Sequence, residues 1–140
     1  MKEDSVLLVD KPAGITSFGV VARVRRRLSE QLGRKAKVGH TGTLDPFATG
    51  LMIIVTGKEC RNAMNYSKLD KEYEATIRLG ASSSTGDPEG TLTPVSSAEP
   101  DEDTVKEALR HFIGEITQTP PAFSAIKVNG RRAYDLAREG

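Results

Sequence analysis

Apolar residues in the first half of the chain form two short runs and one helical stripe. The runs at residues 6–9 and 51–56 contain no charged side chain and predict two short buried strands. Between them, apolar residues recur at steps of three and four, which predicts a helix that runs to about Leu32. Thr16 or Ser17 can cap its start, and Gly33 can end it in a left-handed conformation. The side chains expected on its buried face are Phe18, Val21, Val24, Leu28 and Leu32.

Residues 71–79 show the alternation of a half-buried strand. Apolar side chains at positions 73, 75, 77 and 79 alternate with charged or polar ones. We therefore expect Tyr73 to point toward the buried side, where its hydroxyl needs a hydrogen-bond partner. The pattern leaves open whether Tyr73 is an ordinary core residue or a functional one.

A second amphipathic helix is predicted over residues 101–113, with acids in its first turn and Gly114 at its end. Its expected inward side chains are Val105, Ala108, Leu109, Phe112 and Ile113, and His111 is expected to face solvent. A short helix is also expected over residues 58–66 and a short strand over residues 91–95.

The C-terminal region gives three further signals. Residues 117–127 are stiffened by proline and predict an extended segment. Asn129-Gly130 predicts a hairpin turn, and residues 134–138 begin a last helix. Helices that alternate with strands and hairpins favour an α+β fold with a mixed sheet.

The composition fits a soluble globular protein of one domain. The chain has 140 residues, of which 37% are apolar and 28% charged. No apolar run approaches the length of a membrane span, and no signal-peptide core follows the first four residues. The single cysteine, Cys60, cannot form an internal disulfide, so a cytoplasmic location is the default expectation. Cys60, His40 and His111 lack metal-ligand spacing, and we expect no metal site.

Charge is unevenly distributed, although the formal net charge is only +1. Residues 23–37 carry seven basic side chains and one acid, whereas residues 87–107 carry seven acids and one lysine. Such a basic segment can contact a phosphate backbone, or it can be a solvated helix face. Aromatic residues make up only 5% of the chain, which argues against serial stacking on single-stranded bases.

The segment from residue 39 to residue 50 contains three glycines and Pro46, which exclude a regular helix or strand. Because the second apolar run follows at once, we expect a tight loop at the edge of a sheet that presents the carboxylate of Asp45. An ordinary turn is the alternative, since Asp-Pro and Thr-Gly are common turn pairs.

Three stretches together resemble the TruB-type tRNA pseudouridine-55 synthases. They are LVDKPAGITS at residues 8–17, GHTGTLDPFATG at residues 39–50, and KEY at residues 71–73 with RLG at residues 78–80. The tail with QTPP, SAIK and YDLAR, from residue 118 to residue 138, is similar to the RNA-gripping loop of this family. The similarity implies the pseudouridine synthase fold, an α+β fold with a mixed, largely antiparallel sheet flanked by helices.

The resemblance implies isomerisation of one uridine in the T-stem-loop of tRNA, without a cofactor. Asp45 matches the catalytic carboxylate, which either attacks C1′ as a nucleophile or helps to form a glycal intermediate. The expected partner is tRNA, with no membrane and no obligatory protein partner.

Further site residues follow from the same resemblance. His40 matches the residue that helps to extrude and support the target base. Tyr73 matches the active-site tyrosine, which is expected to pack against the flipped uracil and to take part in deprotonation at C5. The expected RNA contacts are Lys11, Lys127, Arg131 and Arg132, the last three within an RNA-gripping loop at about residues 117–140.

These motifs correspond to the first part of the family's catalytic domain. We expect residues 1–140 to lack the later Lys-Gly-Thr-Tyr-Ile-Arg motif, whose arginine pairs with the catalytic carboxylate. We also expect them to lack the small C-terminal RNA-binding domain. The chain by itself is therefore expected to bind tRNA weakly and not to isomerise uridine.

Two other functions stay open from the sequence. One is an RNA-binding or tRNA-chaperone module without catalysis, which a tritium-release assay on C5-labelled uridine would distinguish. The other is a relative of the guide-RNA-dependent pseudouridine synthases, which would need a guide RNA and partner proteins. The ATG ending at residues 48–50 and the LVDKP opening at residues 8–12 are more similar to the stand-alone bacterial type.

Overall fold

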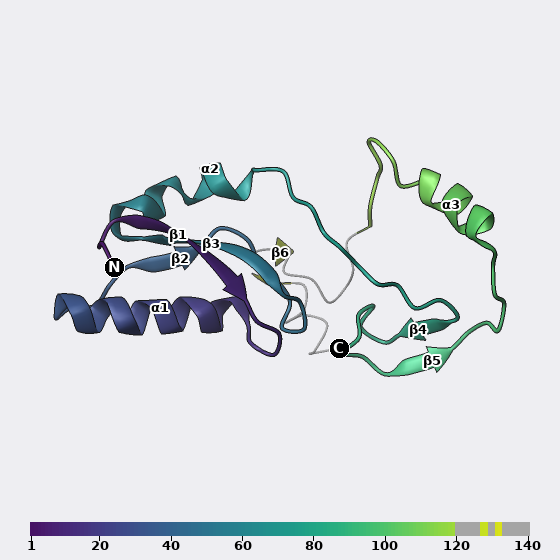
Figure 1. Cartoon of the computed structure of the whole chain (residues 1–140), viewed down its shortest axis with the longest axis horizontal. Coiled ribbons are helices and arrows are strands. Elements are labelled where there is room, and N and C mark those ends of the chain that lie inside the picture. The colour runs from purple at the N-terminus through teal and green to yellow at the C-terminus, as the bar shows by residue number, and fades with distance from the viewer. Residues whose placement is uncertain (120–126, 129–130, 133–140) are drawn as a thin grey trace. The chain divides into compact units, whose positions relative to one another are not determined.

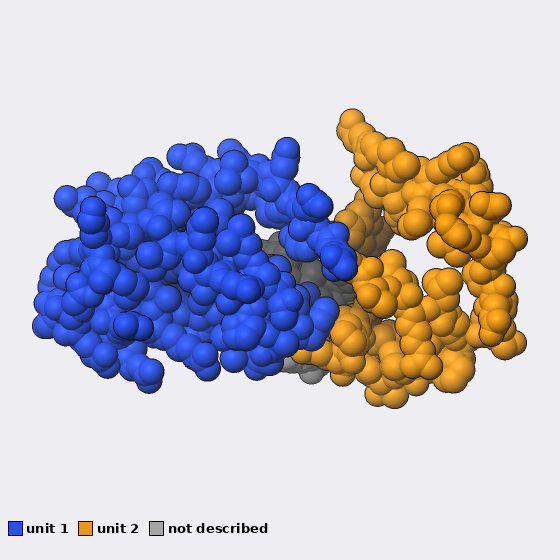
Figure 2. All heavy atoms as spheres, in the orientation of Figure 1, with its two compact units in different colours: residues 1–74 blue, residues 75–140 orange. Residues whose placement is uncertain are grey.

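The computed structural model describes residues 1–119, 127–128 and 131–132. The chain divides into two compact units, Met1–Glu74 and Ala75–Gly140, which Figure 2 shows in different colours. The first unit contains both the glycine-rich stretch with Asp45 and the basic segment at residues 23–37. It therefore carries most of the candidate site.

The first unit is a three-stranded antiparallel sheet with a long helix on one face (Figure 1). Its elements in chain order are β1 (Ser5–Lys11), α1 (Ser17–Leu32), β2 (Val38–His40), β3 (Gly50–Thr56), the 3₁₀ helix η1 (Gly57–Asn62) and α2 (Ala63–Ser67). The strands lie in the order β1-β3-β2. The α+β class, both predicted strands, the long helix and the short helix after β3 are confirmed.

The core of the first unit lies between α1 and the facing side of the sheet. Leu7 pairs with Ile54 and Val9 with Met52, so these four side chains share the face that α1 covers. The helix contributes Val20, Val21 and Leu28, all buried. Burying one side chain of this size contributes about 1.5–3 kcal/mol, so this layer holds the helix firmly to the sheet.

Phe18 is not part of this core, and the prediction for it is wrong. Its side chain is 63% exposed, and the guanidinium of Arg25 lies over its ring at 5.7 Å from the centroid. Ser17, four residues before Val21 on the same helix face, occupies the inward position of the first turn instead. The apolar pattern could not show this, because a polar residue fills the buried position.

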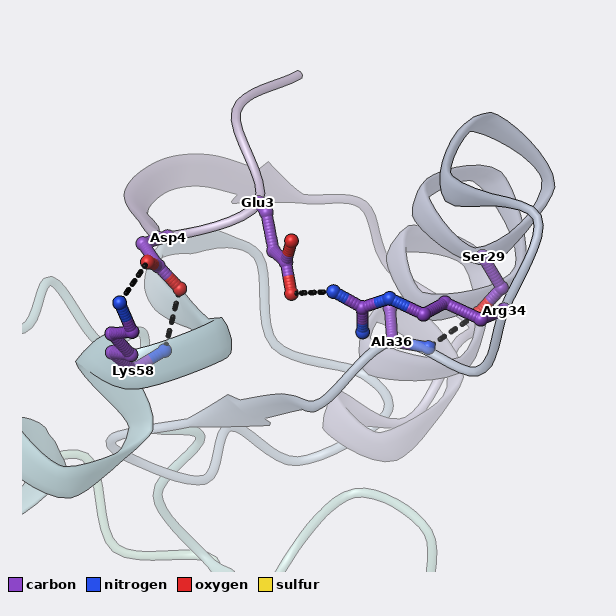
Figure 3. Close-up of polar contacts among 6 residues, drawn as sticks. All are labelled: Glu3, Asp4, Ser29, Arg34, Ala36 and Lys58. Atoms are coloured by element: carbon purple, nitrogen blue, oxygen red, sulfur yellow. Dashed lines mark hydrogen bonds and ion pairs between the residues drawn. The ribbon is translucent and has the colours of Figure 1, made fainter.

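The predicted ends of α1 are confirmed. The Thr16 hydroxyl accepts a hydrogen bond from the Gly19 N–H at 3.0 Å, and Gly33 ends the helix with φ 67°. Beyond it, the Ala36 N–H donates to Ser29 Oγ at 2.9 Å (Figure 3). This bond fixes the return of the chain from α1 toward β2.

Polar contacts also tie the beginning of the chain to the end of α1 and to η1 (Figure 3). Glu3 forms an ion pair with Arg34. One oxygen of Asp4 accepts a hydrogen bond from the Lys58 N–H at 2.8 Å, and the other lies 3.8 Å from Lys58 Nζ. Segments distant in sequence therefore close this end of the unit.

The described part of the second unit contains two pairs of short antiparallel strands and a short helix. Strands β4 (Ala81–Ser83) and β5 (Leu92–Pro94) pair antiparallel, and β5 confirms the strand predicted at residues 91–95. Strands β6 (Lys127–Val128) and β7 (Arg131–Arg132) pair antiparallel, as the predicted hairpin requires, while its Asn129-Gly130 turn lies outside the described residues. The extended segment from residue 120 to residue 126 and the last helix, residues 134–138, lie outside the described residues. None of the described helices has the length and apolar character needed to cross a membrane.

Helix α3 (Glu102–Arg110) begins as predicted but ends early. Asp101 caps it by accepting from the Thr104 N–H at 2.8 Å, and hydrogen bonds from the Thr104 side chain and backbone hold the pKa of Asp101 below its ordinary value. The prediction that Leu109, Phe112 and Ile113 face inward is wrong, since all three are more than half exposed. His111 is exposed, as predicted. An amphipathic helix buries its apolar face only against a second layer, which the described part of this unit does not supply.

The strand predicted over residues 71–79 does not form. Residues 70–78 have no regular secondary structure, and every side chain from residue 71 to residue 79 is exposed. Tyr73 is 69% exposed, so the prediction that it points to a buried side is wrong. An alternating sequence becomes a strand only beside another strand, and none of the described strands pairs with this segment.

We predict that Gly57→Ala destabilises the first unit more than Gly33→Ala. Both glycines have left-handed φ angles, 56° and 67°, a conformation that costs an alanine about 1–2 kcal/mol. A Cβ at Gly57 also contacts the Asp4 side chain and lies 2.8 Å from the Glu3 carbonyl oxygen, whereas one at Gly33 meets nothing within 4 Å. Thermal unfolding measures the difference, and equal melting temperatures would contradict this account.

Candidate functional site

Residues 41–49 connect β2 to β3 and carry Asp45; we call them the Asp45 loop. The loop contains no helix or strand, but the predicted exclusion over residues 39–50 was too wide, because Gly39 and His40 belong to β2 and Gly50 begins β3. The Thr41 N–H donates to the Ile53 carbonyl at 3.1 Å, which keeps the base of the loop against the sheet. The Ala48 N–H donates to the Asp45 carbonyl at 3.1 Å, which closes a turn at its tip. The prediction of a tight loop at a sheet edge is therefore confirmed.

Residues 11–17, from the last residue of β1 to the first residue of α1, hold the Asp45 loop; we call them the anchor segment. The buried Ser17 hydroxyl makes two hydrogen bonds to Leu44, the residue before Asp45. It accepts from the Leu44 N–H and donates to the Leu44 carbonyl, both at 2.8 Å. The backbone on one side of Asp45 is thus fixed to the start of α1.

Lys11 fixes the backbone on the other side of Asp45. Its side chain is 0% exposed, and Nζ donates to the carbonyls of Pro12 (3.0 Å), Ile15 (2.9 Å) and Pro46 (3.2 Å). The Gly14 N–H also donates to the Pro46 carbonyl, at 2.8 Å. The three N–H groups of the ammonium are all used within the protein. Lys11 thus binds the anchor segment to the loop, and this arrangement leaves no ammonium N–H free for the RNA contact that the resemblance implied.

The side chain of Asp45 has no such support. It is exposed, and its carboxylate forms no hydrogen bond or ion pair with any residue that the structure describes. Its direction therefore depends on the backbone, which is held at Leu44 and Pro46. A carboxylate presented in this way can reach a ligand without first leaving a partner.

His40 is the last residue of β2 and lies at the start of the Asp45 loop. It pairs with Ile54 on the sheet and is partly buried. Its Nδ1 is buried and has no hydrogen-bond partner in the part of the chain that the structure describes. Such unpaired buried atoms are uncommon in folded proteins. The structure thus brings His40 and Asp45 to the same end of the sheet.

The other predicted site residues are not brought to this loop by what the structure describes. Tyr73 is exposed in the unpaired segment after α2. The β6–β7 hairpin contains Lys127, Arg131 and Arg132, whose backbones are described and whose side chains are not. Within the described ranges, no three His, Cys, Asp or Glu side chains are grouped as metal ligands.

A cleft of about 420 Å³ lies near the C-terminal end of α1; we call it the basic cleft. Its lining residues are Glu3, Asp4, Arg34, Lys37, Gly57, Lys58 and Arg61. Two of its four cations are paired with acids, as Figure 3 shows for Arg34 with Glu3 and Lys58 with Asp4. Arg34 and Lys37 belong to the predicted basic segment. Lys58 and Arg61 could not be predicted from the sequence, because the pairing of β2 with β3 brings η1 beside that segment.

The chain is similar to one protein family and to named members of it. Residues 26–140 match the family model described as TruB family pseudouridylate synthase, N-terminal domain. The chain is 50% identical to a tRNA pseudouridine synthase B of Phocaeicola vulgatus over 141 residues, which cover 99% of this chain and 60% of the relative. It is 48% identical to that of Aquifex aeolicus over 137 residues, which cover 98% of this chain and 46% of the relative. The chain spans about half the length of the curated relatives it matches.

We predict that Lys11→Met lowers the free energy of unfolding of the first unit by about 1–3 kcal/mol. Methionine fills a similar volume, but it removes one hydrogen-bond donor from each of three backbone carbonyls, of which Pro46 keeps the Gly14 N–H. Chemical denaturation measures the effect, and Lys35→Met, at an exposed position, is the matched control. Identical unfolding midpoints for the two variants would show that the buried ammonium does not hold the loop.

Proposed function

The chain belongs to the TruB family of pseudouridylate synthases, and we propose that the whole protein converts a uridine in the T-stem-loop of tRNA to pseudouridine. The relatives named tRNA pseudouridine synthase B support this proposal. The observation that carries it is the exposed carboxylate of Asp45, which has no partner among the described residues and lies between two residues whose backbones are fixed. Such an arrangement orients a reactive group before the substrate arrives.

The proposed reaction moves the uracil from an N1 linkage to a C5 linkage. The C1′–N1 bond breaks, the base turns, and a C1′–C5 bond forms. C5 loses a proton and N1 gains one, so the reaction needs no oxidant, reductant or leaving group. Asp45 acts at the sugar, either as a nucleophile on C1′ or as the group that helps to form a glycal.

The target base must leave the RNA stack before it reacts, at a cost of a few kcal/mol. His40, at the start of the Asp45 loop, is assigned to support the displaced base. Tyr73 is assigned to pack against the uracil and to take part in removal of the C5 proton. Its exposed position leaves the ring accessible to a base.

We assign the contacts with RNA outside the target uridine to the basic cleft and to the Lys127–Arg132 hairpin. Because A-form RNA hides the base edges of its major groove, these contacts go mainly to phosphates and 2′-hydroxyls. Helix α1 has 16 residues and is about 24 Å long at 1.5 Å per residue. It has Ser17 at one end and Arg34 just beyond the other, so the cleft meets backbone well away from the reacting base.

We predict that Asp45→Asn abolishes turnover in a full-length version of the protein, while tRNA binding survives. The amide has the size of the carboxylate but cannot take its role at C1′. Tritium release from tRNA labelled at uridine C5 measures turnover, a gel shift measures binding, and Asp70→Asn provides a second exposed carboxylate as control.

A rate for Asp45→Asn within tenfold of wild type would exclude Asp45 as the catalytic group, since it corresponds to less than about 1.4 kcal/mol of barrier. A wild-type protein that binds tRNA and releases no tritium would instead favour a non-catalytic RNA-binding protein. The basic cleft alone is the observation that supports this second candidate.

We predict that Lys37→Glu combined with Arg61→Glu weakens tRNA binding and makes it less sensitive to salt. Each lost phosphate contact lowers the slope of log affinity against log salt concentration by about one. Lys106→Glu, in the acidic segment, makes the same kind of charge change and is the control. Unchanged affinity and slope would show that the basic cleft does not meet RNA, and Arg131→Glu with Arg132→Glu tests the hairpin in the same assay.

A further inference from the structure

We propose that Ser17 is a positioning residue for Asp45, and that its hydroxyl sets the direction of the catalytic carboxylate. The proposal rests on the function proposed above for Asp45. Ser17 lies 27 residues before Leu44 in the sequence. Its hydrogen bonds to the loop, within the described residues, are made by its side-chain oxygen. It acts on Asp45 through the backbone of the preceding residue.

A single hydroxyl fixes both backbone groups of Leu44. Its oxygen accepts from the Leu44 N–H at 2.8 Å, and its proton is donated to the Leu44 carbonyl at 2.8 Å. Both distances are within the normal range for hydrogen bonds of hydroxyl groups. The two bonds restrain the peptide planes on both sides of Leu44, and the second of these planes leads directly into Asp45. The Cα–Cβ direction of Asp45 is therefore coupled to the start of α1.

The carboxylate of Asp45 makes no bond of its own in the described structure, so the backbone is its only fixed reference. Pro46 is held by Lys11 and Gly14, and Leu44 is held by Ser17. Removing the Ser17 hydroxyl would release one of these two attachments while leaving the other in place. In a reaction that depends on aligning one oxygen with C1′, a displacement near 1 Å is enough to lower the rate about a hundredfold.

The burial of Ser17 indicates that its hydroxyl holds the Asp45 loop and does not cap the helix. The side chain is 3% exposed and occupies an inward position of α1, where the helix otherwise places apolar residues. Thr16, the preceding residue, already caps the helix by accepting from the Gly19 N–H. Two adjacent hydroxyls at one helix end thus have separate partners, and only that of Ser17 binds the Asp45 loop.

This separation supplies a matched pair of variants, Ser17→Ala and Thr16→Ala. The experiment compares the single-turnover rate of pseudouridine formation with the affinity for tRNA in the full-length protein. For Ser17→Ala we expect the rate to fall about 10–100-fold, with tRNA affinity within about threefold of wild type. For Thr16→Ala we expect a loss of thermal stability typical of a helix cap and a rate within about threefold of wild type. Ser17→Thr, which keeps a hydroxyl, should recover most of the rate.

A second measurement is independent of activity. Amide hydrogen exchange at Leu44, followed by NMR, should be slow in the wild type and in Thr16→Ala, and faster in Ser17→Ala. Equal Leu44 exchange in the wild type and Ser17→Ala would overturn the proposal, as would a Ser17→Ala rate within threefold of wild type. These results are distinguishable from failure of the proposed function, which would appear as a wild-type protein without activity or an active Asp45→Asn variant.

Discussion

The attachment of the Asp45 loop to the anchor segment is the constraint on which the candidate site depends. The sheet fixes only the two ends of this loop, at His40 and Gly50. Hydrogen bonds from Ser17 in α1 and Lys11 in β1 fix the residues beside Asp45 relative to these two elements. The apolar layer between α1 and the sheet therefore matters for the proposed chemistry, because it fixes the distance between the start of the helix and the loop.

The fold of the first unit could be predicted from the sequence because its patterns find their partners within residues 1–74. The two apolar runs pair as β1 and β3, and the helical stripe packs on the face that they share. The alternation at residues 71–79 and the apolar face of α3 are equally regular, but they remain exposed. Periodicity states which face of a segment is apolar; it does not state what will cover that face. These predictions failed where the covering layer is not among the described residues.

For the candidate site, the sequence indicated the residues that we propose to contact the substrate, and not the residues that hold them in place. Glycine and proline content predicted the loop, and the family resemblance pointed to Asp45 and His40. Lys11 was predicted to contact RNA because its charge is evident from the sequence, whereas its burial against three carbonyls depends on the fold. The sequence contains only an indirect sign of the role of Ser17: the apolar stripe of α1 lacks an apolar residue four positions before Val21. A buried polar side chain that bonds a distant backbone has no periodic signal.

The two ends of α1 act on different steps of the proposed reaction. In the proposed function, cations of the basic cleft attract phosphates through interactions that salt screens, so they would contribute affinity with little dependence on RNA sequence. The bonds of Ser17 and Lys11 are short, buried and directed at one backbone, so they affect the orientation of a group already beside its substrate. Binding and chemistry are therefore separable at the level of side chains, although one helix supports both. Loss of the apolar core under α1 would disturb both binding and chemistry, because the helix fixes the position of the anchor segment relative to the basic cleft.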